Sequence, residues 1–418
     1  MHSYVIITAH FITPDWTMRG LTISFEEVPE SHTGENLAEK FIEIAKKYGI
    51  EEKISSIISD NANNAMLGIN LAAKRLSTNE NQILPLKCLT HILHLVASAG
   101  FESLAGPMAK LKAIVTKIRS STTAPATLKG FCVPHKETYS KPMTDSEEVE
   151  LDAGNDRVND WDAEVPGKLG THFPVLSSEE WAKLEEIRAL LQPFKLASEH
   201  LSGSSYCTLS NGGFVARWLL AHLQAHADKD LFKAREDKDL KVDVEAMIKK
   251  LQKYMGDFEE QSLLPSFFDP RYLHQLATHD KISAVNAIKK LLPRPDPHAM
   301  AHQPKLPPKP KSFFDTFAPH TQAAPSSLDT VTKGFPELAE YVTIFSIQAE
   351  DDPLRWWACN QTRFPNLAVL ARDHLAMLAS TVPSEETFSA AGNMVTAKRS
   401  SMKPETVQAL MIAQSWRK

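Results

Sequence analysis

The sequence is poor in cysteine and contains no long apolar run. Its four cysteines in 418 residues do not suggest a disulfide framework, so we expect a reducing compartment. No stretch approaches the roughly 20 consecutive apolar residues that a membrane-spanning helix needs. The N-terminal segment MHSYVIITAHF lacks the basic region and the small-residue cleavage site of a signal peptide. A membrane protein and a disulfide-stabilised secreted protein are therefore not expected.

The sequence also lacks a large excess of positive charge. The formal net charge is −5, which argues against a protein that coats nucleic acid. The charge is uneven, because residues 145–164 hold nine acids and one base, a net of −8. The rest of the chain is then at +3, a balance that permits contact with DNA without requiring it.

The N-terminal part has the pattern of a mixed α/β fold. YVIITAHFI and TMRGLTISFEEV read as two strands of a hairpin around the turn TPDW. Thr33 is a candidate N-cap for the helix that follows, and Gly49 is placed to end it. A short apolar run then ends at Asp60, and a helix follows through AMLGINLAAKRL. The order strand, strand, helix, strand, helix predicts a mixed sheet covered by helices.

The middle of the chain changes to long amphipathic helices. Ser177 and Glu180 have the spacing of a capping box, and apolar residues recur at helical intervals after them. We therefore predict a helical domain over 173–293. The acidic segment before it has the composition of a surface loop, and the Pro-rich segment after it that of an extended linker.

Asp60 and Glu385 are the candidate catalytic carboxylates. A carboxylate at the C-terminal end of a strand is well placed for a hard cation such as Mg²⁺, which prefers oxygen ligands. The alternative for Asp60 is that it caps the following helix. Glu385 lies in VPSEETFSAAG, where Ser384 reads as the N-cap, and the alternative is that Glu385 stabilises the helix dipole. Spacing alone does not place the two residues together.

Two C-x-x-H pairs stand in the N-terminal part. They are Cys88 with His91, and Cys132 with His135. Together they are one candidate for a structural zinc site, although the spacing is unlike that of a standard finger. The alternative for Cys88 and His91 is a buried thiol and a hydrogen-bonded histidine on a helix.

The C-terminal part is rich in large apolar residues and includes a small basic cluster. An exposed apolar patch marks a partner surface, and Trp is a favoured interface residue. The alternative is that these residues dock on the preceding domains, and the two do not exclude each other. Candidate association residues are Trp356, Trp357, Phe364, Leu367, Leu370, Leu375 and Phe388. Lys398 and Arg399 are candidate contacts to DNA phosphate, the alternative being a solvated face.

These motifs together resemble a transposase of the hAT superfamily in a domesticated or degenerate form. YVIITAHFITPDWTMRG, SHTGENLAEKF, ISDNANNAM and CLTHILHLV resemble the ribonuclease H-like half of the family in order. LLPSFFDPRY resembles the DPR-type motif of its helical region. The longest resemblance joins DPLRWWACNQTRFPNLAVLARDHLAM and STVPSEETFSAAGNMVTAKRSSMKPETVQAL to the C-terminal dimerisation region.

The resemblance implies a D, D, E triad that binds two divalent metal ions, Mg²⁺ or Mn²⁺. Asp60 then matches the second Asp and Glu385 matches the Glu. Cys88 and His91 match the C-x-x-H that supports the active site. The first Asp is expected on a strand upstream of Tyr4, so this chain is expected to lack it, together with the BED-type zinc finger and the RWNST-type motif.

The sequence thus predicts an α/β plus α protein. It combines an incomplete ribonuclease H-like domain, interrupted by an all-helical insertion, with a helical dimerisation region. The expected segments are a partial ribonuclease H-like core at 1–135, an acidic loop at 136–172, a helical insertion at 173–293, a linker at 294–330 and the dimerisation region at 331–418. We expect a nuclear homo-oligomer with residual DNA binding, no membrane partner, no catalysis and no cofactor. The alternative is an active metal-dependent transposase or nuclease whose first Asp comes from an upstream segment.

Overall fold

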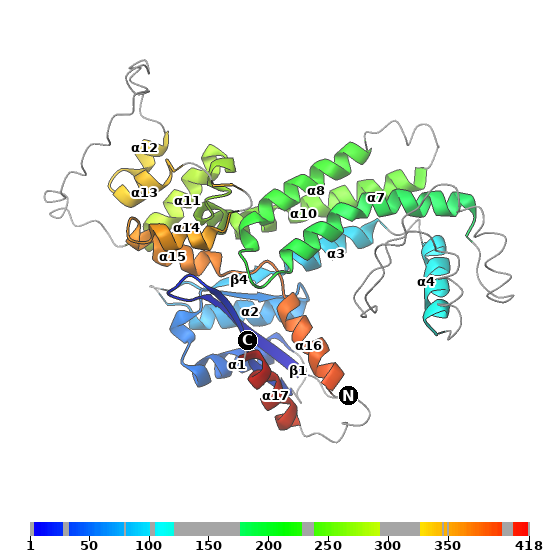
Figure 1. Cartoon of the computed structure of the whole chain (residues 1–418), viewed down its shortest axis with the longest axis horizontal. Helices are drawn as coiled ribbons and strands as arrows, with labels where there is room; N and C mark the ends of the chain where they lie inside the picture. Colours follow the sequence, from blue (N-terminus) through cyan, green and yellow to red (C-terminus); the bar gives the residue numbers. More distant parts are fainter. Residues whose placement is uncertain are drawn as a thin grey trace, which may run out of the picture. The chain divides into compact units, whose positions relative to one another are not determined.

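The computed structural model describes ten segments of the chain, which are mostly helical. They are residues 4–27, 33–78, 81–100, 105–120, 176–227, 238–292, 327–344, 347–348, 351–394 and 404–416. Figure 1 shows these segments coloured along the sequence. They belong to two compact units. The first unit comprises residues 1–95, 195–222 and 249–418, and the second comprises residues 96–194 and 223–248. The helical segment predicted over 173–293 thus contributes to both units, while the acidic loop at 136–172 lies entirely outside the described residues.

The described elements alternate strands and helices only in the N-terminal part. The strands are β1 (Tyr4–Ile12), β2 (Met18–Glu27), β3 (Ser56–Ser59) and β4 (Leu84–Lys87). The helices up to residue 300 are α1 (Gly34–Tyr48), α2 (Asn63–Leu76), α3 (Leu89–Ala99), α4 (Ala105–Ser120), α7 (Ser178–Leu201), α8 (Gly212–Ala227), α10 (Lys238–Phe268) and α11 (Thr278–Leu291). The later helices are α12 (Ser327–Thr332), α13 (Pro336–Tyr341), α14 (Pro353–Asn360), α15 (Pro365–Leu375), α16 (Val382–Met394) and α17 (Pro404–Trp416).

The predicted hairpin is confirmed. β1 and β2 pair antiparallel from Ile12 opposite Met18 to Tyr4 opposite Glu27, with a bulge between Ile7 and Thr8. The turn places Trp16 at φ +64°, a left-handed conformation that a bulky residue rarely adopts. Burial of the Trp16 ring at 4% exposure holds this conformation in place.

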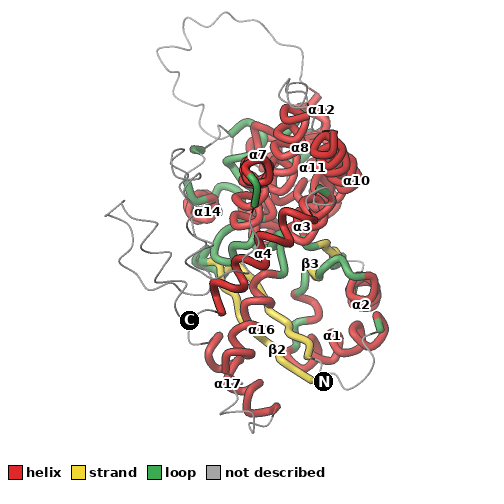
Figure 2. The backbone as a smooth tube through the Cα atoms, turned by 90° about the vertical axis from the view of Figure 1, so that its right-hand side faces the viewer, coloured by secondary structure: helices red, strands yellow, loops and turns green. Residues whose placement is uncertain are grey.

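The described strands form two separate two-stranded sheets, which corrects the prediction of one mixed sheet. β3 and β4 pair in parallel, and β1 and β2 form the other sheet, seen as the long yellow ribbon in Figure 2. Helix side chains cover one outer edge of each sheet. Thr22 on β2 receives a hydrogen bond from Trp416 Nε1 to its carbonyl (3.1 Å) and donates its N–H to Ser415 Oγ (2.7 Å). On β4, the Lys87 N–H donates to Gln261 Oε1 (2.9 Å). These side chains occupy backbone groups that would otherwise bond a further strand.

Local capping explains where α1 begins and ends, as predicted. The Thr33 hydroxyl accepts from the Asn36 N–H (3.3 Å), which is the bond of an N-cap residue. Gly49 ends the helix at φ +61°, where glycine lacks the Cβ that disfavours this conformation. α1 packs against α2 over a small core formed by Ala38, Ile42, Ile57, Ala72, Ala73 and Ile83.

The main core of the first unit is an aromatic cluster, which we define as Trp16, Phe267, Phe268, Tyr341, Trp357 and Phe364. Trp16 stacks on Trp357 with ring centroids 5.9 Å apart. The buried polar atoms of the cluster are satisfied, because Trp357 Nε1 donates to the Phe268 carbonyl (2.7 Å) and Tyr341 donates to the Phe267 carbonyl (3.0 Å). The hairpin turn, the end of α10 and the helices α13 to α15 therefore share one core.

The second unit contains α4 and parts of α3, α7, α8 and α10. The capping box predicted at the start of α7 is confirmed. The Ser177 N–H donates to Glu180 Oε2 (2.9 Å), and the Glu180 N–H donates to Ser177 Oγ (3.2 Å). Lys110 on α4 pairs with Glu180 at 2.7 Å.

Candidate functional site

The parallel strands β3 and β4 end side by side, and each is followed by a predicted site residue. Asp60 follows β3 and is exposed, whereas Cys88 follows β4 and is 1% exposed. The Cys88 N–H donates to the Ser59 carbonyl (3.0 Å), which continues the ladder to this point. Asn61 Nδ2 donates to the Cys88 carbonyl (3.3 Å), so the turn that carries Asp60 is tied to Cys88.

A second set of contacts ties Cys88 to the start of α16. The Thr381 N–H donates to Cys88 Sγ (3.4 Å), and the Thr381 hydroxyl oxygen lies 3.4 Å from the same sulfur. The Thr381 hydroxyl also donates to Glu385 Oε1 (3.0 Å). The polypeptide around Asp60, Cys88 and Glu385 is therefore joined by hydrogen bonds, although Glu385 is 325 residues from Asp60 in the sequence.

The start of α16 differs from the prediction that Ser384 is its N-cap. α16 begins at Val382, three residues before the start that a Ser384 N-cap would give, so Thr381 takes the N-cap position. Pro383 in the first turn is compatible with this start, because the first helical N–H groups have no intrahelical partner. Ser384 Oγ instead donates to the Thr381 carbonyl (2.6 Å). Glu385 is exposed and lies within the first turns of the helix, where a negative charge complements the dipole.

Asp60 is not the N-cap of α2, which is the alternative that local pattern offers. The N-cap residue of α2 is Ala62, and it makes no side-chain capping bond. Asp60 Oδ1 accepts the Ala62 N–H (3.2 Å), a bond within the turn that precedes the helix. Asp60 thereby keeps its position at the strand end while leaving its second carboxylate oxygen unused by this bond.

The chemistry of the donors suits a hard divalent cation. Carboxylate oxygens stand at Asp60 and Glu385, and the amide oxygen of Asn61 is buried without a hydrogen-bond partner among the described residues. Mg²⁺ and Mn²⁺ prefer such oxygen donors. Within the described part of the chain, no group of three His, Cys, Asp or Glu side chains converges as a metal site. Asp60 and Glu385 thus remain predicted ligands.

His91 lies in the first turn of α3 and is half-buried. Cys88 is buried, as the buried-thiol alternative for this residue expects. Cys132 and His135 lie outside the described residues, so the structure does not test the second C-x-x-H pair. Cys88 and His91 remain predicted supports of the active site.

Most of the predicted association residues are buried inside the chain. Trp357, Phe364, Leu367 and Leu375 are at most 1% exposed and belong to the same core as the aromatic cluster. Trp356 and Leu370 are partly buried against this core. For these residues the structure shows the intramolecular docking that the sequence left open. Burying large apolar side chains in this core removes them from the surface that a partner would contact.

Phe388 is the exception, because it is 44% exposed on α16. Its ring lies 6.0 Å from the ring of Phe25 on β2. Met411 on α17 is buried against Phe25 in the same small cluster, and the neighbouring Leu410 is 46% exposed. Phe388 of α16 and Met411 of α17 therefore both pack near Phe25 of the hairpin.

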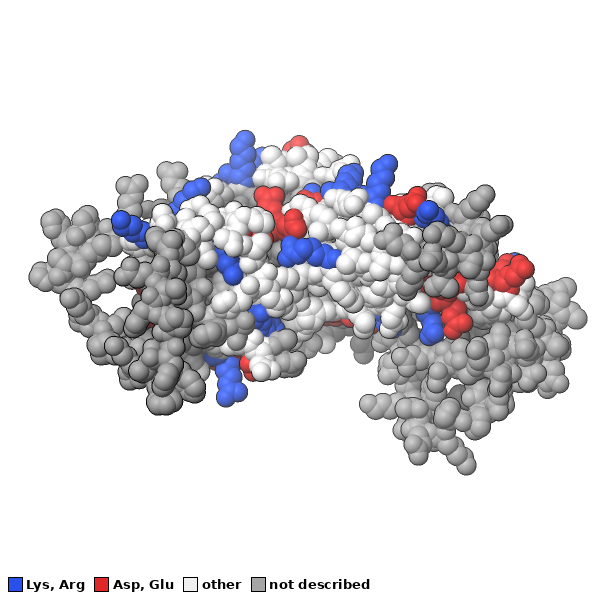
Figure 3. All heavy atoms as spheres, turned by 90° about the horizontal axis from the view of Figure 1, so that it is seen from above, with Lys and Arg blue, Asp and Glu red and all other residues white. Residues whose placement is uncertain are grey.

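Lys398 and Arg399, the predicted DNA contacts, lie outside the described residues. On the face seen in Figure 3, the described Lys and Arg side chains are scattered among acidic and uncharged residues. That face shows no continuous basic stripe over the described elements. The structure therefore does not test the predicted contact of Lys398 and Arg399 with DNA.

A buried ion pair supports the segment resembling the DPR-type motif. Asp269 is fully buried and accepts from Arg271 Nε (2.9 Å), Arg271 Nη2 (2.7 Å) and Ser210 Oγ (2.7 Å). Burial opposes the charge of Arg271, but the hydrogen bonds and the charge of Asp269 raise the pKa of Arg271 above its ordinary value. Sequence reasoning singled out this motif without predicting the pair.

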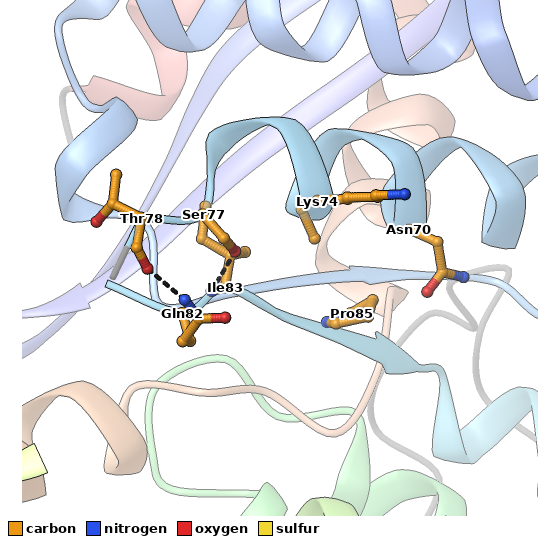
Figure 4. A pocket seen from close by; sticks show the side chains of 8 residues that line it. Asn70, Lys74, Ser77, Thr78, Gln82, Ile83 and Pro85 are labelled. Carbon is orange, nitrogen blue, oxygen red and sulfur yellow. Dashed lines mark hydrogen bonds between the residues drawn. The ribbon is translucent and has the colours of Figure 1, made fainter. Parts of the chain in front are cut away.

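A shallow hollow of about 460 Å³ lies beside the C-terminal end of α2 (Figure 4). Its lining is mostly polar and includes Asn70, Lys74, Ser77, Thr78 and Gln82. Two of its lining residues are joined by a hydrogen bond, in which the Ile83 N–H donates to Ser77 Oγ (2.9 Å). Asp60 precedes the opposite end of α2, so the hollow is not part of the strand-end site.

Among the described helices, none combines the length and the apolar character that crossing a bilayer requires.

Models of known protein families match the N-terminal and the C-terminal parts of the chain. The model of the hAT family C-terminal dimerisation region matches residues 337–417, and the model of the ZBED1 RNase-like domain matches residues 1–85. The chain is similar to the hAT family over its C-terminal helices and to an RNase-like domain over its N-terminal strands. The resemblance inferred from the sequence motifs is therefore confirmed, and the hAT dimerisation region covers α13 to α17 with the exception of its first residue, Pro336.

Full-length relatives agree with this relationship at low identity. The chain is 25% identical to the putative AC transposase of Zea mays, over 99% of this chain and 55% of that protein. It is 23% identical to the zinc finger BED domain-containing protein RICESLEEPER 3 of Oryza sativa subsp. japonica, over 99% of this chain and 59% of that protein. It is 22% identical to the putative transcriptional regulator tpeD of Talaromyces stipitatus, over 98% of this chain and 51% of that protein. The chain thus spans little more than half the length of these relatives.

Sequence reasoning missed two residues that organise the strand-end site. Asn61 could have been found from the polar run SDNANNA directly after a strand. Thr381 could not be identified as the N-cap from the sequence, because Ser384 is an equally good N-cap by residue type. Only the contact of Thr381 with Cys88, the residue after β4, distinguishes the two.

Proposed function

We propose that this chain is a transposase-derived protein that self-associates through residues 337–417. The match to the hAT dimerisation region carries this proposal. The exposed apolar side chains of α16 and α17 supply the surface, with Phe388 and Leu410 at its centre. Large apolar side chains half-open to solvent favour association, because a second copy removes them from water.

Point substitutions test this surface better than truncation does. Removing the chain after about residue 335 also removes Tyr341, Trp357 and Phe364 from the aromatic cluster, so the remainder loses much of its core. Phe388→Asp combined with Leu410→Asp leaves that cluster intact. Leu291→Asp, at the end of α11 and 45% exposed, is the matched control outside the region.

Light scattering after size exclusion measures the outcome. We expect a discrete dimer or higher assembly for the parent chain and for Leu291→Asp, and a folded monomer for the double variant. A monomeric parent chain, or a double variant that assembles as the parent does, contradicts the proposal. Circular dichroism of the double variant establishes that the helices remain folded.

We also propose that the N-terminal strands and α16 belong to one ribonuclease H-like arrangement into which the central helices are inserted. The match of residues 1–85 to an RNase-like domain supports it, as does the contact between α16 and β1. The expected segment boundaries at 1–135, 136–172, 173–293, 294–330 and 331–418 are part of this proposal.

We further propose a nuclear location and weak DNA binding, with Lys398 and Arg399 as phosphate contacts. The similarity to transposases supports both. Fluorescence anisotropy with duplex DNA over a salt series tests the binding, which should weaken as salt rises.

The strand-end site supports a second candidate function, metal-dependent DNA cleavage. The observation that favours this function is the series of hydrogen bonds that joins the turn at Asp60 to Cys88 and, through Thr381, to Glu385. Two-metal chemistry requires several converging carboxylates, and Asp60 and Glu385 are the two that we assign. We therefore propose that the chain by itself is catalytically inactive. Mn²⁺-dependent strand cleavage that disappears on Asp60→Ala would favour the second candidate instead.

A further inference from the structure

Cys88 forms hydrogen bonds both with the turn after β3 and with the start of α16. Its carbonyl accepts from Asn61 Nδ2, and its thiol is approached by three groups of two threonines. These groups are the N–H and the hydroxyl of Thr381, each at 3.4 Å, and the hydroxyl of Thr90 at 3.1 Å. A buried thiol with this many polar neighbours is part of a network rather than of an apolar core.

The direction of the hydrogen bonds follows from counting protons. Thr381 has one hydroxyl proton, but its oxygen lies close to both Cys88 Sγ and Glu385 Oε1. An ionised carboxylate only accepts hydrogen bonds, so the proton goes to Glu385. The Thr381 oxygen is then left as an acceptor toward the thiol. Cys88, Thr381 and Glu385 thus form a chain in which each group orients the next.

Backbone contacts fix the position of Thr381 itself. The Ala379 carbonyl accepts from the Leu89 N–H (2.8 Å), directly beside Cys88. The Ala379 N–H donates to Thr208 Oγ1 (3.0 Å), and Thr208 is fully buried. The segment that enters α16 is therefore attached to the end of β4 before the helix begins.

We infer that Thr381 is a positioning residue for Glu385, and that the Cys88 thiol is its anchor. Thr381 is not itself a metal ligand in this arrangement. It holds the Glu385 carboxylate at the strand end where Asp60 stands. The inference rests on neither self-association nor metal binding, so its failure is distinguishable from failure of the proposed function.

Alkylation of individual cysteines by iodoacetamide, followed by peptide mass spectrometry, tests this inference in the full chain. Cys88 becomes accessible only when the contacts around it open. Thr381→Val keeps the shape of the side chain but removes the hydroxyl, whereas Thr381→Ser keeps the hydroxyl. Two internal references are present, since Cys359 is exposed and Cys207 is buried elsewhere in the same unit. Burial raises the pKa of the Cys207 thiol, so its labelling reports wider unfolding.

Losing this hydrogen-bond network should raise the labelling rate of Cys88 about tenfold in Thr381→Val, as expected for one lost buried hydrogen bond. Thr381→Ser should stay within about threefold of the parent, because the hydroxyl is retained. Cys207 and Cys359 should be unchanged in both variants. Thr381→Val should also assemble as the parent does, because Thr381 lies outside the proposed association surface.

A double-mutant cycle with Glu385→Gln separates positioning from packing. If Thr381 and Glu385 act through one hydrogen bond, adding Glu385→Gln to Thr381→Val produces no further increase in Cys88 labelling. Additive effects of the two substitutions would overturn the inference. So would unchanged Cys88 labelling in Thr381→Val, or an equal rise at Cys207.

Discussion

The aromatic cluster and the strand-end site lie in the same unit but are built in opposite ways. The cluster buries large rings completely and satisfies their few polar atoms within the core. The strand-end site exposes its two carboxylates, and each accepts one hydrogen bond: Asp60 from the Ala62 N–H and Glu385 from the Thr381 hydroxyl. The difference indicates that stability comes from the cluster, whereas residues at the strand end are open to change without unfolding the protein.

The largest expected effect comes from breaking the cluster. Trp357→Ala removes a fully buried ring and its hydrogen bond to the Phe268 carbonyl, and it exposes one face of Trp16 to a cavity. The free energy of unfolding should fall by about 3–5 kcal/mol, measured by urea denaturation. Trp218→Ala is the matched control, since Trp218 is 49% exposed, and it should change stability by less than about 1 kcal/mol.

The buried ion pair beside the cluster comes next. Asp269→Ala leaves the Arg271 guanidinium buried without its carboxylate, which should destabilise the protein by about 3 kcal/mol. Glu259→Ala removes an ion pair to Arg217 whose two side chains are exposed, so its effect should be below about 1 kcal/mol. If both substitutions lowered the free energy of unfolding equally in urea denaturation, the distinction between the buried and the exposed ion pair would be contradicted.

A pH series tests β1, the strand whose turn enters the cluster. Burial lowers the pKa of His10 from 6.5 to about 4, and its ring packs over Gly20 on β2. Between these values the unfolded chain binds a proton that the folded chain does not, so stability should fall as pH drops from about 6.5 to 4. Above this range the contribution of His10 is constant. His10→Gln should flatten part of the slope. His200 and His374, whose pKa values burial also lowers, contribute to the rest.

The smallest effect is expected at the strand-end site. Asp60→Asn and Glu385→Gln replace exposed side chains, so each should change the free energy of unfolding by less than about 0.5 kcal/mol. The same denaturation series measures it. A loss comparable to that of Trp357→Ala at either position would show that the strand end is part of the stabilising core.

Local features of the fold were predictable from the sequence because neighbouring residues determine them. Thr33 and Gly49 bound α1 as expected, and Ser177 with Glu180 forms the predicted capping box. The β1–β2 hairpin also follows from its alternating pattern and its turn. Each of these depends on contacts within a few residues of the chain.

Pairing between distant segments was not predictable in the same way. The order of strands and helices suggested one mixed sheet, but side chains of α10 and α17 cover the outer edges of two separate pairs. Likewise, an apolar C-terminal sequence does not reveal whether Trp357 faces a partner or the end of α10. The hydrophobic effect has no direction, so composition does not select between these arrangements.

The sequence by itself determined the caps of α1, the capping box of α7, the hairpin and the similarity to the hAT transposases, because these features depend on residues close together in the sequence. Only the tertiary structure decided that Asp60 and Glu385 belong to linked segments. That link depends on the Cys88 thiol, the Thr381 hydroxyl and a helix start three residues earlier than expected. Contacts between residues nearly three hundred positions apart are set by how whole elements pack, and no local pattern encodes them.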